Sequence, residues 1–262
     1  MNVARAASIL AHQTWLEAWH ARLPVMLGAL VMLGLITQWF IGAVSLVENA
    51  SSGLAIAAPL VRLLAVALVA SISVSLIARE LSDRRIELML SAPIERPTWV
   101  MGRLTGMGMV AITVSCAASF GLAGNVRVSS LLSWWVSLVP ELLLVAALSI
   151  AVTVALKRYA LSLLALALLY VTARLIGTIH QLSSSNLPGL ASLDSWDAAH
   201  WFIGALAVML PRLELYAPSQ WLVSEIPLPE ALHQLGLGAG QFAIYLALLT
   251  AACCIDLRRD ID

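Results

Sequence analysis

Six long apolar segments, separated by shorter polar stretches, dominate the pattern of this chain. They run from Pro24 to Val47, Leu54 to Ala78, Leu104 to Gly124, Leu132 to Leu156, Ala160 to Ile179 and Leu235 to Ile255. A helix needs ~20 apolar residues to cross the hydrocarbon layer of a bilayer, and each segment meets that length. Backbone groups in lipid must be hydrogen-bonded within their own segment, and the alternation typical of barrel strands is absent. The pattern therefore predicts six membrane-spanning helices.

The first 23 residues follow a different pattern, in which apolar residues recur at helical spacing among charged and polar ones. This predicts an amphipathic helix that lies along the membrane interface, with Trp15 and Trp19 at headgroup depth. A cytosolic helix packed on a partner protein has the same pattern and stays open as an alternative. The chain is thus predicted to be an all-α integral membrane protein, with an interfacial helix in residues 1–23 and one six-helix domain in residues 24–262.

Composition strengthens the membrane assignment. The 262 residues are 61% hydrophobic and 11% charged, and the mean hydropathy is +0.91. A water-soluble domain of this size would then have a largely apolar surface, which excludes that class. The net charge is zero, so nucleic acid is not an expected partner. The three cysteines lie in or beside apolar segments and do not form the pattern of a disulfide framework.

The distribution of positive charge predicts the orientation. An even number of spans places both termini on one side, and that side receives Arg5, Arg22, Arg79, Arg84, Arg85, Arg96, Arg103, Lys157, Arg158, Arg258 and Arg259. The other side receives only Arg127 and Arg212. Positive residues accumulate in cytoplasmic loops, so both termini are predicted to be cytoplasmic.

Residues 79–103 form a charged island between the second and third spans. Ser82 suits the N-cap of a short helix, and Pro93 ends it because proline disfavours helical geometry in the residue before it. The apolar face of this helix would consist of Ile86, Met89 and Leu90. The island therefore predicts a short helix on the cytoplasmic surface, available to a soluble partner. A solvated connector between two spans is the alternative.

Residues 180–234 form the longest stretch between predicted spans. Within it, residues 200–210 are apolar and are followed by Pro211. Such a helix covers only ~16 Å, about half of the hydrocarbon thickness. The pattern predicts re-entrant or interfacial helices on the outer side before span six, or part of a small external domain.

Motifs of catalysis are missing from the sequence. There is no G-x-x-x-x-G-K-[ST] phosphate loop, and the one lysine, Lys157, sits in LKRYA, so the chain is not itself a Walker-type ATPase. The motifs H-E-x-x-H, C-x-x-C and G-x-S-x-G do not occur either. The five histidines are scattered without metal-ligand spacing, so no catalytic residue, metal site or cofactor is predicted.

Three charged residues, Arg62, Glu141 and Arg174, lie within predicted spans two, four and five. At ~1.5 Å per residue, they lie about 24, 22 and 21 Å above the cytoplasmic face, which is one common level. An ionised residue at that depth costs ~3 kcal/mol unless it is paired or hydrated. We expect Glu141 to bond one or both arginines, lining the outer part of a pathway or a subunit interface. Separate snorkelling of each arginine to the outer headgroups is the alternative.

The island and the topology together resemble the permease subunits of ATP-binding-cassette (ABC) type-2 exporters. An acid-rich stretch, a short helix ending in L-[SA]-x-P-[IV]-x-R, and G-[RK]-x-x-G at the third span carry the resemblance. The matching residues are Glu80, Asp83, Glu87, Leu88, Leu90, Ser91, Pro93, Ile94, Arg96, Gly102, Arg103 and Gly106. Many members have Gly-Thr where this chain has Arg85-Ile86, and Lys in place of Arg103. By loop style, the nearest group includes permeases for copper-enzyme maturation, although no copper-ligand pattern occurs here.

The resemblance implies that the loop helix is a coupling helix that docks on a separate ATPase subunit. The residues expected to contact that subunit are Asp83, Arg84, Ile86, Glu87, Met89, Leu90, Pro93 and Arg96. Residues 1–23 match the elbow helix of the family. The implied complex has two permeases, as a homodimer or with a paralogue, and two ATPases that bind ATP and Mg. It lies in the bacterial cytoplasmic (inner) membrane, and a periplasmic protein is a further candidate partner.

Two other functions stay open. A channel or secondary transporter would favour inverted repeats and broken helices in both halves, which the sequence does not show. An integral-membrane enzyme would need polar residues that converge at one depth, and the candidates, Arg62, Glu141 and Arg174, include no nucleophile. Gly102 and Gly106 permit close helix approach, either between two copies of the chain or within one. The substrate does not follow from the sequence.

Overall fold

The computed structural model describes residues 3–44, 51–82, 96–184 and 228–259, together with Trp201, Gly204, Ala205 and Leu213. These residues contain no strand, which confirms the all-α prediction for this part of the chain. The seven described helices are α1 (Val3–His20), α2 (Leu23–Val44), α3 (Ser51–Ser82), α5 (Arg96–Leu122), α6 (Val128–Leu156), α7 (Tyr159–Ser184) and α9 (Leu228–Arg259). A short 3-10 helix, η1 (Ala123–Asn125), follows α5.

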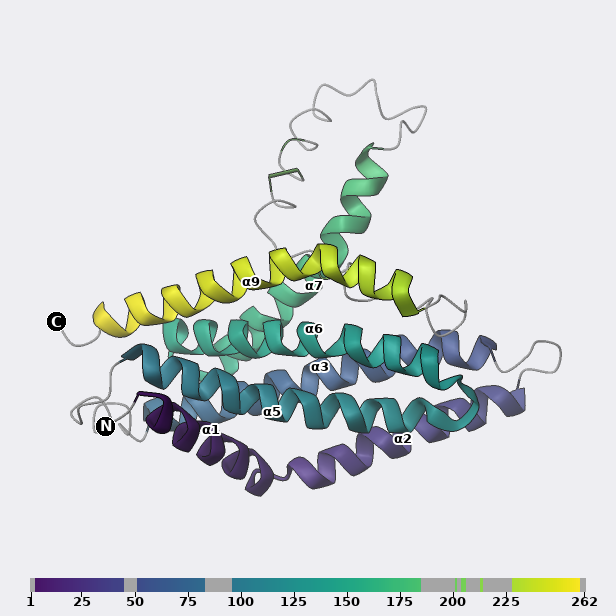
Figure 1. Cartoon of the computed structure of the whole chain (residues 1–262), viewed down its shortest axis with the longest axis horizontal. Coiled ribbons are helices and arrows are strands. Elements are labelled where there is room, and N and C mark those ends of the chain that lie inside the picture. The colour runs from purple at the N-terminus through teal and green to yellow at the C-terminus, as the bar shows by residue number, and fades with distance from the viewer. Residues whose placement is uncertain are drawn as a thin grey trace.

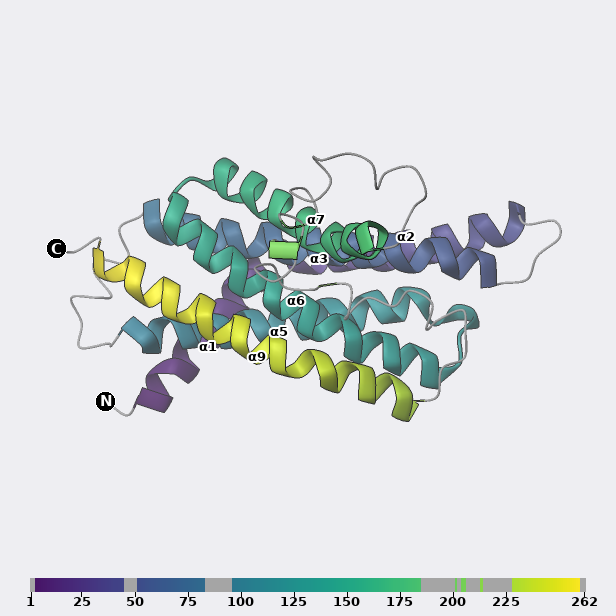
Figure 2. The same ribbon diagram turned by 90° about the horizontal axis from the view of Figure 1, so that it is seen from above.

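The long helices lie lengthwise in one bundle with α6 at its centre. Helix α6 contacts α3, α5, α7 and α9, while α2 packs on α3 and α5 (Figure 1). Helix α1 crosses one end of the bundle and packs mainly on α5. That same end holds the end of α3, the start of α5 and the end of α9, as Figure 2 also shows. The C-terminal part of α7 leaves the bundle in Figure 1 and is seen end-on in Figure 2.

Within the described residues, five helices are long and apolar enough to cross a membrane. The qualifying stretches are Leu23–Phe40, Ile56–Ser82, Pro97–Leu122, Val128–Leu156 and Tyr159–Ile176. Helix α9 carries a shorter apolar stretch, Ala239–Ile255. Several apolar helices in one chain suggest a multi-pass membrane protein, as expected. The layout of six spans stays a prediction.

Most of the described helices are longer than the apolar segments that predict them. Helix α3 continues to Ser82, where the serine hydroxyl donates to the carbonyl oxygen of Arg79 at 3.0 Å. Ser82 is the last residue of α3 that the structure describes, and its predicted role as the N-cap of a following helix stays a prediction because residues 83–95 lie outside the described part. Helix α5 begins at Arg96 and holds Pro97 in its first turn, where the missing N–H of proline costs no hydrogen bond. Backbone hydrogen bonding does not stop at the membrane surface, so hydropathy underestimates helix length.

Two charged residues with positive φ mark changes of chain direction. Arg22, at φ 68°, separates α1 from α2, and the Ala21 amide donates to the Glu17 carbonyl at 2.9 Å. Lys157, at φ 53°, follows α6, and its amide donates to the Thr153 carbonyl at 2.9 Å. A left-handed residue after a helix satisfies its last carbonyl groups and lets the chain turn.

The core is built from small and branched side chains of α3, α5 and α6. Fully buried examples are Ala57, Val61, Ala65, Val110, Ala111, Val114, Leu138, Leu142 and Ala146. Helices α2 and α5 approach closely at two glycines, because a Cβ on Gly34 would lie 3.0 Å from the Gly121 carbonyl oxygen. Small residues at crossings are typical of helix packing in lipid, where close contact replaces the hydrophobic effect.

Two regions singled out in the sequence fall largely outside the described residues. Of the island, the structure describes residues 79–82, at the end of α3, and 96–103, at the start of α5. Of residues 180–234, it describes 180–184 in α7 and 228–234 in α9, with the four separate residues named above. The predicted re-entrant or interfacial helices over 200–210 stay a prediction.

Candidate functional site: buried charges at two levels

Glu141 of α6 is fully buried and contacts an arginine on each of two neighbouring helices. Its Oε2 lies 3.3 Å from Nη1 of Arg62 on α3, and its Oε1 lies 3.1 Å from Nη1 of Arg174 on α7. The hydroxyl of Tyr170 donates to the same Oε1 at 2.9 Å. One carboxylate thereby joins α3, α6 and α7. We call Arg62, Glu141, Tyr170 and Arg174 the charge cluster.

Three side chains on one face of α6 contact Arg62. Its side chain is 1% exposed, and Nη2 donates to the Ser137 hydroxyl at 2.6 Å. The guanidinium carbon lies 5.3 Å from the ring centroid of Trp134, within the range of a cation–π contact. Trp134, Ser137 and Glu141 follow one another at spacings of three and four residues, which places them in one row along α6. This row orients the arginine toward Glu141.

The contacts of the cluster favour binding of charge over catalysis. Ser137 donates its own hydroxyl to the carbonyl oxygen of Trp134 at 2.7 Å, so no base activates it in this geometry. Arg174 is 28% exposed, whereas Arg62 and Glu141 are buried. In the contacts that the structure describes, one carboxylate faces two guanidinium groups. Glu141 thus bridges a buried arginine and a partly exposed one.

A proline lies beside each of the two buried charges. Pro59 precedes Arg62 by less than one turn of α3, and Pro140 directly precedes Glu141 in α6. Proline lacks the amide hydrogen that would bond the carbonyl four residues earlier, so each helix is weakened at this level. Their proximity to the charges gives both helices a point at which they can bend.

The structure thus brings together all three charged residues that the depth estimate placed at one level. In the alternative, each arginine extends separately to the outer headgroups. Arg62 does not do so in this structure, because its side chain is 1% exposed and contacts Glu141 and Ser137 of α6. Sequence reasoning missed Trp134, Ser137 and Tyr170, because uncharged polar and aromatic residues are common in spans. The available signal was spacing, since Ser137 and Glu141, like Tyr170 and Arg174, stand four residues apart. That the cluster lines a pathway or an interface stays a prediction.

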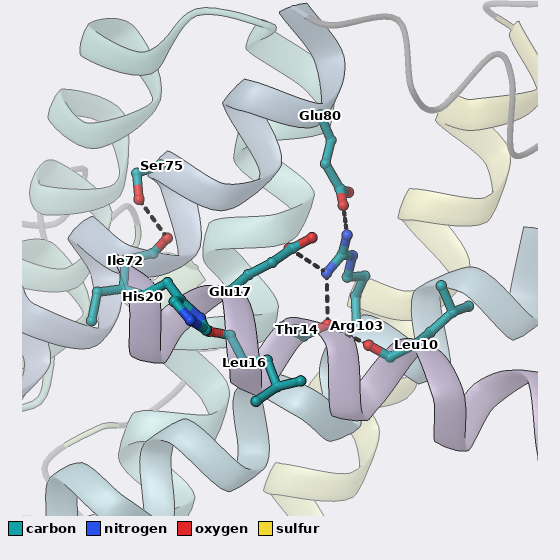
Figure 3. A network of polar contacts seen from close by, with 9 residues as sticks. All are labelled: Leu10, Thr14, Leu16, Glu17, His20, Ile72, Ser75, Glu80 and Arg103. Atoms are coloured by element: carbon teal, nitrogen blue, oxygen red, sulfur yellow. Dashed lines mark hydrogen bonds and ion pairs between the residues drawn. The ribbon is translucent and has the colours of Figure 1, made fainter. Parts of the chain in front are cut away.

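A second buried arginine, Arg103 of α5, joins α1, α3 and α5 at the end of the bundle that α1 crosses (Figure 3). Its Nη1 donates to the Thr14 hydroxyl at 2.7 Å and to Oε2 of Glu17 at 3.1 Å, both on α1. Its Nη2 pairs with Oε1 of Glu80, in the last turn of α3. The side chain is 1% exposed. We call these four residues the arginine bridge.

Two glycines beside Arg103 form a seat for α1. A Cβ on Gly102 would lie 2.7 Å from the Cβ of Leu10, and one on Gly106 would lie 2.5 Å from the Cβ of Thr14. Both distances are shorter than real carbon–carbon contacts, so α1 lies directly against the backbone of α5. The glycines therefore serve packing within one chain, one of the two alternatives left open by the sequence. Arg103, between them, ties α1 in place.

The residues predicted to contact an ATPase lie almost entirely outside the described residues. This applies to Asp83, Arg84, Ile86, Glu87, Met89, Leu90 and Pro93. Arg96 begins α5, and the structure describes its backbone alone. The described residues also contain no group of three or more His, Cys, Asp or Glu side chains that could hold a metal ion.

No protein-family model and no curated protein sequence matches this chain.

Proposed function

We propose that this chain is the transmembrane permease subunit of an ATP-binding-cassette exporter. It couples ATP hydrolysis on a separate subunit to the movement of a substrate across the cytoplasmic membrane, and it is not itself an enzyme. The arginine bridge is the observation that carries the proposal. The bridge joins the end of α3 and the start of α5, which border residues 83–95, to α1. A soluble ATPase that binds residues 83–95 could then move the three helices together.

The connection from the bridge to the charge cluster supports the same mechanism. Glu80 of the bridge and Arg62 of the cluster lie on one continuous helix, α3, separated by ~27 Å of helix length. Helices α1, α3 and α5 are linked at Arg103, so a displacement of residues 83–95 moves them together. Motion at the arginine bridge then changes the geometry of the ion pairs in the charge cluster. The partner would in this way shift the chain between two conformations.

The proposed assembly contains two permease chains and two ATPase subunits, with ATP and Mg bound by the ATPases. It lies in the bacterial inner membrane with both permease termini in the cytoplasm, and a periplasmic protein is a further candidate partner. The resemblance of residues 80–106 and of the topology to ABC type-2 permeases supports this composition. Helix α1, seated on α5, takes the place of the elbow helix.

A second candidate is an ATP-independent channel or secondary transporter. Pro59 and Pro140 favour it, because each removes one backbone hydrogen bond of a helix beside an intramembrane charge, and secondary-transporter sites are typically formed where spanning helices depart from regular geometry. The two candidates differ in one measurable property, which is the presence of an ATPase partner. An ATPase that accompanies the chain through gentle purification excludes the second candidate.

Met89→Asp tests the proposal directly. Met89 stands on the predicted apolar face of the loop helix, and a charge buried in an interface costs several kcal/mol. We expect the variant to lose the co-purifying ATPase while the membrane part remains folded and monodisperse. The ATPase is measured by quantitative mass spectrometry and by ATP hydrolysis in the purified sample.

Tyr159→Asp is the matched control. Tyr159 is 46% exposed and begins α7, where an acid is favoured by the helix dipole. It places the same charge on the predicted cytoplasmic side but outside residues 83–95, so the ATPase should be retained. Unchanged ATPase recovery with Met89→Asp would refute the coupling role of this segment.

A further inference from the structure

Helix α6 lacks one backbone hydrogen bond directly before Glu141. Pro140 has no amide hydrogen, so the carbonyl oxygen of Val136 loses its helical partner, although the helix continues to Leu156. Proline is one of the few identified causes of sharp bends in helices. Pro140 therefore gives α6 a hinge between a first segment, residues 128–139, and a second segment, residues 141–156.

The guanidinium of Arg62, on the neighbouring helix α3, contacts α6 on both sides of this proline. Before Pro140, its Nη2 donates to the Ser137 hydroxyl at 2.6 Å, and its central carbon lies 5.3 Å from the ring centroid of Trp134. After Pro140, its Nη1 lies 3.3 Å from Oε2 of Glu141. One rigid, planar group therefore spans the position at which α6 lacks a backbone hydrogen bond.

Burial makes these contacts sensitive to the angle of the hinge. Arg62, Ser137 and Glu141 are all buried, so water does not replace a contact that breaks. A bend at Pro140 moves Ser137 relative to Glu141, and Arg62 then reaches one of them but not both. The angle seen in this structure is the one that allows both contacts at once.

A second proline weakens α3 beside the same ion pair. Pro59 lies three residues before Arg62 and removes one backbone hydrogen bond of α3. Helices α3 and α6 pack on each other, and the ion pair of Arg62 with Glu141 joins them. Both helices thus have a weak point next to the contact that links them.

We propose that Arg62 is a latch across the hinge of α6. With the latch closed, as in this structure, Arg62 contacts Ser137 and Glu141, and the two segments of α6 keep one angle. When the latch opens, Arg62 keeps its ion pair with Glu141 and gives up the hydrogen bond to Ser137, so the first segment swings about Pro140. This order follows because separating a buried ion pair costs more than breaking a single hydrogen bond.

Spin labels on Trp39→Cys of α2 and Leu132→Cys of α6 measure the angle of the first segment. Both side chains are exposed, and the end of α2 and the start of α6 lie at the same end of the bundle (Figure 1). The full-length chain, with its three natural cysteines replaced by alanine, is studied by pulsed electron paramagnetic resonance. We expect one dominant distance between the labels in this parent chain.

Ser137→Ala opens the latch without altering any charge. Loss of one hydrogen bond to a charged group should raise the population of a second distance, relative to the first, roughly tenfold. Arg62→Met removes the whole latch and should raise that population further. Arg174→Gln is the matched control, because it also removes an arginine paired with Glu141. Within the described residues, the ion pair of Arg174 with α6 lies only after Pro140, so one distance should remain dominant.

Pro140→Ala distinguishes a latch from a residue that only stabilises the fold. It restores the backbone hydrogen bond, so its combination with Arg62→Met or Ser137→Ala should return the labels to one dominant distance. Ser137→Ala decides the matter if Arg62→Met does not fold, as judged by monodispersity and thermal unfolding. Three results would overturn the proposal: an unchanged distance distribution in Ser137→Ala, an equal second population in Arg174→Gln, or a second distance that persists with Pro140→Ala.

The latch goes beyond the proposed function and does not require it. The label distances are measured on this chain alone, whereas the Met89→Asp test measures an ATPase partner. Failure of either experiment leaves the result of the other intact.

Discussion

At the scale of single residues, one buried ionised group organises each of the two sites. The carboxylate of Glu141 pairs with Arg62 and Arg174 and accepts a hydrogen bond from Tyr170. The guanidinium of Arg103 donates to the Thr14 hydroxyl and pairs with Glu17 and Glu80. A buried charge is expensive unless partners surround it, so each site depends on its buried members, whereas a partly exposed partner such as Glu17 contributes less. Loss of a single partner should therefore cost more than loss of the whole set.

Glu141→Gln tests this dependence. The change leaves two guanidinium groups facing a neutral amide, and removal of one partner from a buried ion pair costs ~3–5 kcal/mol. We expect a marked drop in stability, measured by denaturant unfolding in detergent. A triple variant that also carries Arg62→Gln and Arg174→Gln should recover much of the loss, because no charge then remains unpaired.

Glu17→Gln serves as the control, because Glu17 also pairs with an arginine but is 38% exposed. Its removal should cost less than ~1 kcal/mol. A triple variant less stable than Glu141→Gln alone would contradict the assignment of the cluster as a mutually dependent set.

At the scale of helices, the seat of α1 on α5 is the closest packing in the described structure that depends on glycine. Gly106→Ala would push a methyl group against Thr14 and the Ala11 carbonyl oxygen, which lies 2.7 Å from the added Cβ. Overpacking of this kind costs ~1–3 kcal/mol. We expect the variant to unfold more easily and α1 to lie further from α5.

Gly108→Ala, two residues along the same helix, is the matched control. There, the added Cβ would meet the nearest atom, Cδ1 of Leu143, at an ordinary 3.5 Å. Its effect should stay within about 0.5 kcal/mol. Thermal unfolding of the two variants, with a distance measurement between labels on α1 and α5, compares them. Equal effects at both positions would contradict the seat.

The sequence predicted the helices well because lipid demands long apolar segments with internally satisfied backbones. It placed Arg62, Glu141 and Arg174 at one level because helix rise converts residue number into depth. It could not name the partner of Gly102 and Gly106, since spacing shows that something approaches closely but not which helix. It also missed Trp134, Ser137 and Tyr170, whose side chains carry no charge to mark them among apolar neighbours.

At the scale of the whole molecule, the spans differ in how much of their surface the chain itself covers. Of the spanning stretches, 67% of the residues are buried in α3 and 61% in α6, against 17% in α2 and 28% in α7. The remainder is available to lipid, to a second copy of the chain or to residues of the chain outside the described part. The proposed function requires two permease copies in the assembled transporter.

Native mass measurement in mild detergent, with the ATPase present, tests this stoichiometry. We expect two permease chains in each complex. Gly106→Ala should leave that number unchanged, because its glycine is used within one chain. A complex that contains an ATPase and a single permease copy would count against the exporter assignment.

The seat of α1 also sets an order of assembly. Thr14 and Arg103 are 89 positions apart in the chain, so α1 is synthesised before α5, the helix that seats it, with α2 and α3 between them. Helix α1 therefore reaches its final position only after α2, α3 and the start of α5 have followed it, although it precedes all three in the sequence.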